Sequence, residues 1–155
     1  MKTILVPVDF SRVTDAVVQE ATSLARALPA RVVLLTVIQP PIIMSEYGAV
    51  LGDVIQITAA GEKHAANQLA RLEEKLGAAS VKTDSVQLNG SSIPLIVDQA
   101  KKLEADYIVM GSHGHTALYD LLVGSTTHGV LMRATCPVVI VPSPKMAKQR
   151  KAPKG

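Results

Sequence analysis

The chain has 155 residues, of which 48% are apolar and 19% charged, and this size and balance favour one folded domain and exclude a wholly disordered chain. No apolar run reaches the roughly 18 residues that a membrane-spanning helix needs, so we expect a soluble protein without membrane insertion. The formal net charge of +3 comes from a tail, because without the five bases after Pro142 there are 11 Lys and Arg against 13 Asp and Glu. With this balance and only 3% aromatic residues, the folded body is not expected to bind DNA or RNA.

The single cysteine, Cys136, excludes an intrachain disulfide, which fits a reducing compartment. Because no CxxC or metal-ligand spacing surrounds it, we interpret Cys136 as a small buried apolar residue at the start of a strand. Residues 1–10 contain only a short apolar stretch that stops at Asp9, which is too short for the core of a signal peptide.

The first elements predict a βαβ unit. Residues 3–8 form an apolar run that ends at Asp9 and Ser11, a pattern typical of a buried strand, a turn and a helix cap. Apolar residues then recur every three or four positions until Pro29 ends the helix. This stripe comprises Val13, Val17, Ala21, Leu24 and Leu28. Residues 31–38 are β-branched and almost continuously apolar, as expected of a strand covered on both faces.

The middle of the chain predicts a loop, a helix and an edge strand. Residues 42–52 have no apolar period and are expected to form a loop, which could close over a site as a lid or cover a dimer. A helix is expected over about residues 53–76, with the inner stripe Ala65, Leu69, Leu72 and Leu76. Residues 81–88 alternate apolar and polar side chains imperfectly, which favours a strand at the edge of the sheet.

The last part of the chain continues the alternation of helices and strands. Ser91 or Ser92 can cap a helix, and Pro94 is tolerated in its first turn. Its inner face is expected to comprise Ile93, Ile96, Val97, Ala100 and Leu103. The remaining expected elements are a strand over 106–110, a helix after Gly124 to about Ala134, and a strand over 137–142 bounded by prolines.

Strands that alternate with helices favour a parallel sheet with helices on both faces, because parallel strands need crossover connections and these are right-handed. Ligands bind such sheets beyond the carboxyl ends of the strands, where the winding direction reverses. If the first strand is central and the fourth lies beside it, the loops after Val8 and Met110 face the same crevice. Functional residues are therefore expected on these two loops.

Glycines and hydroxyls gather where the fourth strand ends and the last helix begins. Gly111-Ser-His-Gly114 follows the strand, and Gly124-Ser125-Thr126 opens the helix. Glycine lets a backbone approach a ligand closely, and a helix start offers N–H donors and a dipole that favours anions. These groups suit a phosphate, although the same residues also suit a strand turn and an ordinary helix cap.

The spacing Gly111-x2-Gly114-x9-Gly124-Ser125 resembles the nucleotide-binding signature of the universal stress protein family, in its ATP-binding branch. The resemblance covers almost the whole chain, from Ile4-Leu-Val-Pro-Val-Asp9 to Pro137-Val-Val-Ile-Val-Pro142. It implies an α/β fold with a five-stranded parallel open sheet, strand order 3-2-1-4-5 and helices on both faces, in the adenine-nucleotide alpha-hydrolase-like class. It also implies a cytoplasmic homodimer, paired through residues 137–142, that binds ATP, ADP or AMP during stress adaptation.

The resemblance implies a set of nucleotide contacts as well. Pro7 and Asp9 would lie beside the adenosine, and Val37 would face the base. Met110 and Gly111 would contact the ribose. The phosphates would be contacted by His113, Gly114, His115, Thr116, Gly124, Ser125 and Thr126. Where family members often have glycine this chain has Phe10, which could alter the loop or shield the base, while Ser11 keeps the hydroxyl.

Several of these residues have a second interpretation. Asp9 could be a turn or cap residue, or could help to hold Mg²⁺ through water. His113 and His115 could form a metal pair, but without an acidic or cysteine partner nearby in sequence hydrogen bonding to phosphate is favoured. His64 and His128 lie on expected helices and are interpreted as surface or packing residues.

Other nucleotide motifs are absent from the sequence. It contains no GxxxxGK[ST] and no GxGxxG after the first strand, so a P-loop and a dinucleotide fingerprint are excluded. The glycines at both ends of residues 48–52 have no lysine after them, and this segment is interpreted as a flexible linker.

Three functions remain open at this point, all in one domain over residues 1–142 with a basic, disordered tail at 143–155. The first is a regulatory or sensor protein whose ATP occupancy changes its affinity for a protein partner. The second is a slow ATP phosphohydrolase, and the third is an interaction module that holds the nucleotide as a filler. No catalytic residue is assigned, because no arginine lies near the motif before Arg133 and no lysine lies between Lys102 and Lys145.

Overall fold

The computed structural model describes residues 1–40, 51–113 and 123–144, and in the second range it describes side chains from residue 55 onward. The sheet has five strands in the order β3-β2-β1-β4-β5, and every neighbouring pair is parallel. This confirms the predicted topology. The strands are β1 (Lys2–Pro7), β2 (Ala30–Ile38), β3 (Thr83–Asn89), β4 (Tyr107–Gly111) and β5 (Val138–Val141).

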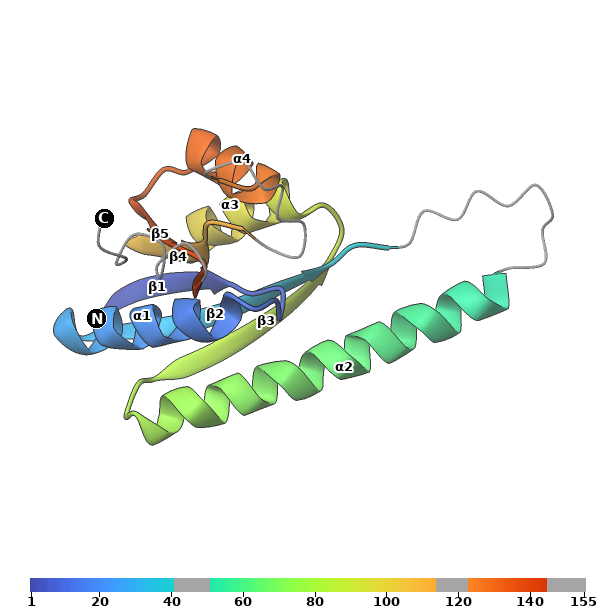
Figure 1. Ribbon diagram of the computed structural model, residues 1–155, viewed down its shortest axis with the longest axis horizontal. Helices are drawn as coiled ribbons and strands as arrows, with labels where there is room; N and C mark the ends of the chain where they lie inside the picture. Colours follow the sequence, from blue (N-terminus) through green and yellow to red (C-terminus); the bar gives the residue numbers. More distant parts are fainter. Residues whose placement is uncertain (41–50, 114–122, 145–155) are drawn as a thin grey trace, which may run out of the picture.

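Two layers of helices enclose the sheet (Figure 1). The helices α1 and α2 cover one face, and α3 and α4 cover the other, as the core contacts also show. The prediction of helices on both faces is therefore confirmed. Their bounds are α1 (Thr14–Ala27), α2 (Leu51–Ala78), α3 (Ser92–Lys102) and α4 (Ser125–Arg133).

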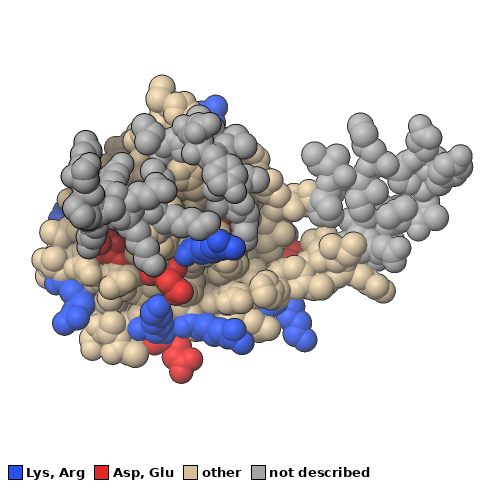
Figure 2. Space-filling view, in the orientation of Figure 1, with Lys and Arg blue, Asp and Glu red and all other residues tan. Residues whose placement is uncertain are grey.

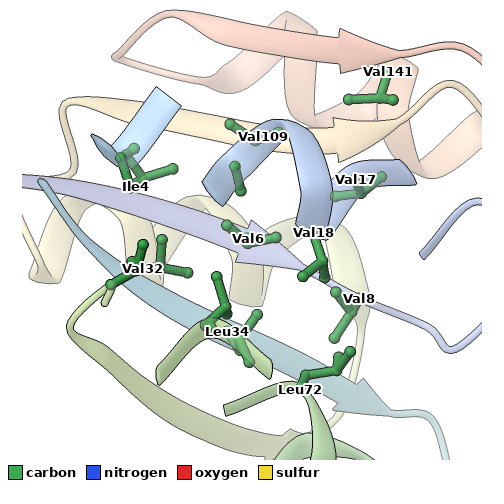
Figure 3. Packing of buried hydrophobic residues seen from close by; sticks show 14 of the residues in the cluster. Ile4, Val6, Val8, Val17, Val18, Val32, Leu34, Leu72, Val109 and Val141 are labelled. Atoms are coloured by element: carbon green, nitrogen blue, oxygen red, sulfur yellow. The ribbon is translucent and has the colours of Figure 1, made fainter. Parts of the chain in front are cut away.

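The central strand β1 is buried on both sides along Ile4, Leu5 and Val6, which explains the apolar run at these positions. Ile4 and Val6 face the helices α1 and α2, whereas Leu5, between them, faces α3 and α4. All three side chains are fully buried. Because successive residues of a strand point to opposite faces, a strand covered on both faces is apolar at nearly every position. Figure 3 shows the first of these two layers, with Ile4 and Val6 among the valines of α1.

The helix α1 differs in part from its predicted stripe. Val13, Val17 and Ala21 are buried, but Leu24 and Leu28 are only partly buried. Val18 and Ala25 are buried in addition. The sheet therefore meets a face of the helix rotated from the predicted one, because the crossing angle on the sheet, and not the spacing alone, decides which positions are covered.

The predicted capping role of Ser11 is wrong, because α1 starts later. The residue at the cap position is Val13, and its side chain makes no capping bond. The backbone N–H of Ser11 instead donates to Oδ1 of Asp9 at 3.0 Å, which forms a turn before the helix. At α3 the predicted residue Ser91 does hold the cap position, although its side chain makes no capping bond.

The helix α2 confirms the predicted inner stripe, because Ala65, Leu69, Leu72 and Leu76 are all buried. Its amino-terminal part extends beyond the sheet (Figure 1), and Ile55 and Ile57 are exposed there. The prediction of an edge strand in this part of the chain is also confirmed, since β3 is the first strand in the order, but it spans Thr83–Asn89 rather than residues 81–88.

Charges of both signs lie among one another on the face in Figure 2. The ion pairs include Lys75 with Asp15 at 3.2 Å and Lys2 with Asp106 at 3.1 Å. Within the described ranges, no helix is both long and apolar enough to cross a membrane.

Candidate functional site

A cleft of about 510 Å³ lies over the carboxyl ends of β1, β2 and β4. Its volume falls within the range of small-molecule sites. The described residues that the sequence predicted for a nucleotide site all line it: Pro7, Asp9, Val37, Met110, Gly111, His113, Gly124, Ser125 and Thr126. The other three predicted residues, Gly114, His115 and Thr116, lie outside the described ranges, as do most of the expected loop at 42–52 and most of the tail at 143–155.

The start of α4 forms one end of this cleft. Gly124 holds the cap position, and the first intrahelical bond runs from the N–H of His128 to its carbonyl oxygen at 2.9 Å. The N–H groups of residues 125–127 therefore lie in the first helical turn, which offers them no acceptor inside the helix. With the positive end of the helix dipole, these donors favour an anion.

Hydrogen bonds attach the start of α4 to the end of β4. The N–H of Gly124 donates to the carbonyl of Ser112 at 2.6 Å, and the hydroxyl of Thr127 donates to the carbonyl of Gly111 at 2.7 Å. The N–H of Ser112 donates to the carbonyl of Val141 at 2.8 Å. Sequence reasoning missed Thr127, although its place in the same hydroxyl-rich helix start was a signal for it. These bonds hold the N–H donors of the helix in place before any ligand arrives.

His113 is buried at this end of the cleft, with 7% of its surface exposed. Its Nδ1 lies 3.2 Å from the hydroxyl oxygen of Ser112. The hypothesis of a metal pair includes His115, which the structure does not describe. In the described ranges, no three His, Cys, Asp or Glu residues gather in a way that could hold a metal ion.

Gly111 serves the packing of the fold as well as the cleft. A Cβ atom at this position would lie 2.5 Å from Cγ1 of Val13 and 3.3 Å from the carbonyl oxygen of His113. The start of α1 can thus approach the end of β4 only because the side chain is absent. The sequence indicated that glycine at position 111 lets a ligand approach the backbone. The structure shows that it also lets Val13 approach.

The opposite end of the cleft contains two aromatic side chains. Phe10 comes from the loop between β1 and α1, and His64 comes from α2. Their ring centroids lie 6.5 Å apart, with the planes at 84°. His64 is exposed at its own helix surface, as interpreted from the sequence, but it also lines the cleft. No sequence signal could have placed it there, because its position depends on how α2 crosses the sheet.

The cleft has few charged side chains among its described residues. Asp9 is the acidic residue, His64 and His113 are the titratable rings, and no lysine or arginine is part of the lining. Binding of an anion by these residues would rest on backbone N–H groups, hydroxyls and the helix dipole rather than on cationic side chains.

Comparison with known proteins agrees with this architecture. The model of the universal stress protein family matches residues 1–142. The chain belongs to this family. A universal stress protein of Methanocaldococcus jannaschii is 30% identical over 145 residues, which cover 93% of this chain and 84% of that protein.

Solved universal stress proteins share the fold. UspA from Lactobacillus plantarum superimposes with a TM-score of 0.82 at 27% identity, over 90% of this chain and 97% of that chain. The universal stress protein from Archaeoglobus fulgidus in complex with dAMP has the same fold, with a TM-score of 0.65 at 20% identity, over 91% of this chain and 98% of that chain. An adenine nucleotide is therefore a ligand of a protein with this fold.

Proposed function

We propose that the cleft binds an adenine nucleotide, with ATP as the first candidate, and that the protein belongs to the ATP-binding branch of its family. The observation that carries the proposal is the start of α4, whose first-turn N–H groups face the cleft beside Gly111 and His113. The dAMP complex of the Archaeoglobus fulgidus protein supports it, because that protein has the same fold.

The two ends of the cleft suggest how such a ligand would lie. Phosphate groups would contact residues 124–127 and His113, while the base would lie toward Val37 on β2. The strands β2 and β4 flank β1, so these ends are separated by about 10 Å, or two strand spacings. Asp9 lies between them and could hold a hydrated Mg²⁺ beside the phosphates. Gly114, His115 and Thr116 belong to the same proposed phosphate site.

We propose a regulatory or sensor role in the stress response for a cytoplasmic homodimer, with one domain over residues 1–142 and a basic tail at 143–155. The strand β5 lies at the edge of the sheet, where its backbone can pair with a second copy. The preceding helix exposes 46% of Leu131 and 71% of Met132, which would add apolar area to that contact.

A role as a sensor is favoured over a role as a hydrolase. Phosphoryl transfer needs cationic groups that stabilise charge on the transferred phosphate, and the described lining of the cleft contains no lysine or arginine. Hydrolysis of ATP, if it occurs at all, would then be slow.

The substitution Ser125→Asp tests the site. It places a carboxylate in the first turn of α4, where it favours the helix but repels phosphate. We expect wild-type protein to release about one adenine nucleotide per chain on denaturation or, if purified empty, to gain thermal stability with millimolar ATP. The Ser125→Asp variant should do neither, while its melting temperature without ligand should equal or exceed that of the wild type.

The matched control is Ser125→Ala, which removes the hydroxyl without adding charge. Retained binding in Ser125→Ala and lost binding in Ser125→Asp would support a phosphate site at the helix start. If wild-type protein is empty and neither ATP, ADP nor AMP raises its melting temperature, the nucleotide proposal fails, and the family fold would serve here as an interaction module.

A further inference from the structure

Phe10 and His64 are not among the residues proposed above to contact phosphate. Phe10 and His64 both line the cleft, and their nearly perpendicular rings have the edge-to-face geometry that aromatic pairs favour. Phe10 also packs partly against the core under α1 and α2. The pair therefore joins the loop after β1 to α2 at the cleft.

The backbone at Phe10 is in an unusual conformation. Its φ angle is 59°, in the left-handed region that bulky side chains rarely adopt. Ser80 and Glu104 also have a positive φ, but each lies two residues after the end of a helix, where this conformation is common. Phe10 instead follows a strand.

The surroundings of Phe10 hold this conformation in place. The hydrogen bond from the N–H of Ser11 to Asp9 closes a turn around it, and the ring contact with His64 fixes the side chain from the other side. A strained residue that lines a cleft and is held from two sides is typical of a residue that contacts a ligand.

We propose that Phe10 is the stacking surface for the nucleobase, that His64 positions its ring, and that this pair makes the cleft selective for purines over pyrimidines. The inference rests on the proposed nucleotide site. Phosphate donors lie at the α4 end of the cleft, which leaves the base to the end formed by Val37, Phe10 and His64. A fused purine ring covers more of an aromatic surface than a pyrimidine ring does, so the loss of Phe10 weakens purine binding more.

Titration calorimetry with ATP and CTP on the full chain tests the proposal. Wild-type protein should bind ATP more tightly than CTP. Phe10→Leu keeps apolar bulk but removes the aromatic face, and it should weaken ATP binding by roughly 5- to 150-fold, the range that one base-stacking contact covers. The same variant should weaken CTP binding less, so that the preference for ATP falls.

Variants of His64 test the positioning role. His64→Ala should lower the preference for ATP over CTP, and His64→Phe, which restores a ring at the same position, should recover it. Asn67→Ala, an exposed change on α2 outside the cleft lining, should leave both affinities as in the wild type. Melting temperatures of all variants show that each one is folded.

The outcomes separate the two proposals. If wild-type protein binds ATP and Ser125→Asp does not, but Phe10→Leu retains the full preference for ATP, the stacking role is overturned and the nucleotide site stands. If His64→Ala retains the preference while Phe10→Leu loses it, the positioning role of His64 is overturned. If wild-type protein binds no nucleotide, the proposed function itself fails.

Discussion

The polar groups at the amino-terminal ends of the strands, here called the amino edge, differ in their hydrogen bonding from those at the carboxyl-terminal ends, the carboxyl edge. At the amino edge, Asp106 accepts the backbone N–H of Thr3 at 2.8 Å and the ammonium group of Lys2 at 3.1 Å. The side chain of Arg31 donates from Nε to the hydroxyl of Thr3 at 3.1 Å. These groups form a connected network that the fold completes by itself.

At the carboxyl edge, the backbone is strained at one residue and some buried polar groups have no hydrogen-bond partner among the described residues. Phe10 has a positive φ angle, and the hydroxyl oxygens of Ser11 and Thr14 are buried without a hydrogen-bond partner among the described residues. Thr14 and Phe10 line the cleft. The strained backbone and the unpartnered hydroxyls thus lie at the edge where a ligand would bind. Features that cost stability are expected at binding sites, because they are retained there for function.

The largest effect on stability is expected for Gly111→Ala at the carboxyl edge. Its Cβ would overlap with Val13, and overpacking of this kind costs about 1–3 kcal/mol of unfolding free energy. Urea denaturation measures the loss. Gly77→Ala on α2 is the control, because a Cβ there would meet no atom from outside its own stretch of helix within 4 Å, and it should stabilise the helix by about 0.5–1 kcal/mol.

The double variant Val13→Ala with Gly111→Ala sharpens this test. It removes the overlapping methyl groups, so the two substitutions should cost less together than the sum of the single changes. Additive losses would contradict the contact between Val13 and Gly111 as the cause.

A pair of threonine substitutions compares an unpartnered hydroxyl with a bonded one. Thr14→Val removes the unpartnered hydroxyl and should raise the unfolding free energy by about 1 kcal/mol, because that group loses its hydrogen bond to water on folding. Thr127→Val removes the bond to Gly111 and should lower the unfolding free energy by about 1 kcal/mol. Destabilisation by both changes would mean that the hydroxyl of Thr14 has a partner in solution.

The smallest effect is expected at the amino edge, for Asp106→Asn. The backbone hydrogen bond from Thr3 and then the contact with Lys2 hold the pKa of Asp106 below its ordinary value of 3.8. A lowered folded-state pKa stabilises the protein above about pH 3.8, and this stability is lost as the pH falls through the folded-state pKa.

Thermal melts between pH 7 and pH 3 check this sign. The Asp106→Asn variant should be less stable than wild type at pH 7, and the difference should shrink at the acidic end. Asp98→Asn, at an exposed position of α3, is the control. A gap between Asp106→Asn and wild type that stays constant with pH would contradict a role for the Asp106 carboxylate.

The sequence by itself determined the elements and the position of the glycine-rich loop, whereas the order of the strands followed from the resemblance to the universal stress protein family. The spacing of apolar residues is a local property of the sequence. The stripe from Ala65 to Leu76 and the apolar run from Ile4 to Val6 can therefore each be recognised without knowledge of the rest of the chain. The alternation of helices and strands leaves few topologies, and with the strand order that the resemblance implies, both loops of the cleft could be assigned to one edge.

Only the tertiary structure decided which side chains from distant elements meet. The contact of Phe10 with His64, the approach of Val13 to Gly111 and the burial of the Thr14 hydroxyl depend on the angles at which α1 and α2 cross the sheet. Those angles come from the packing of whole layers, and no local pattern in the sequence encodes them.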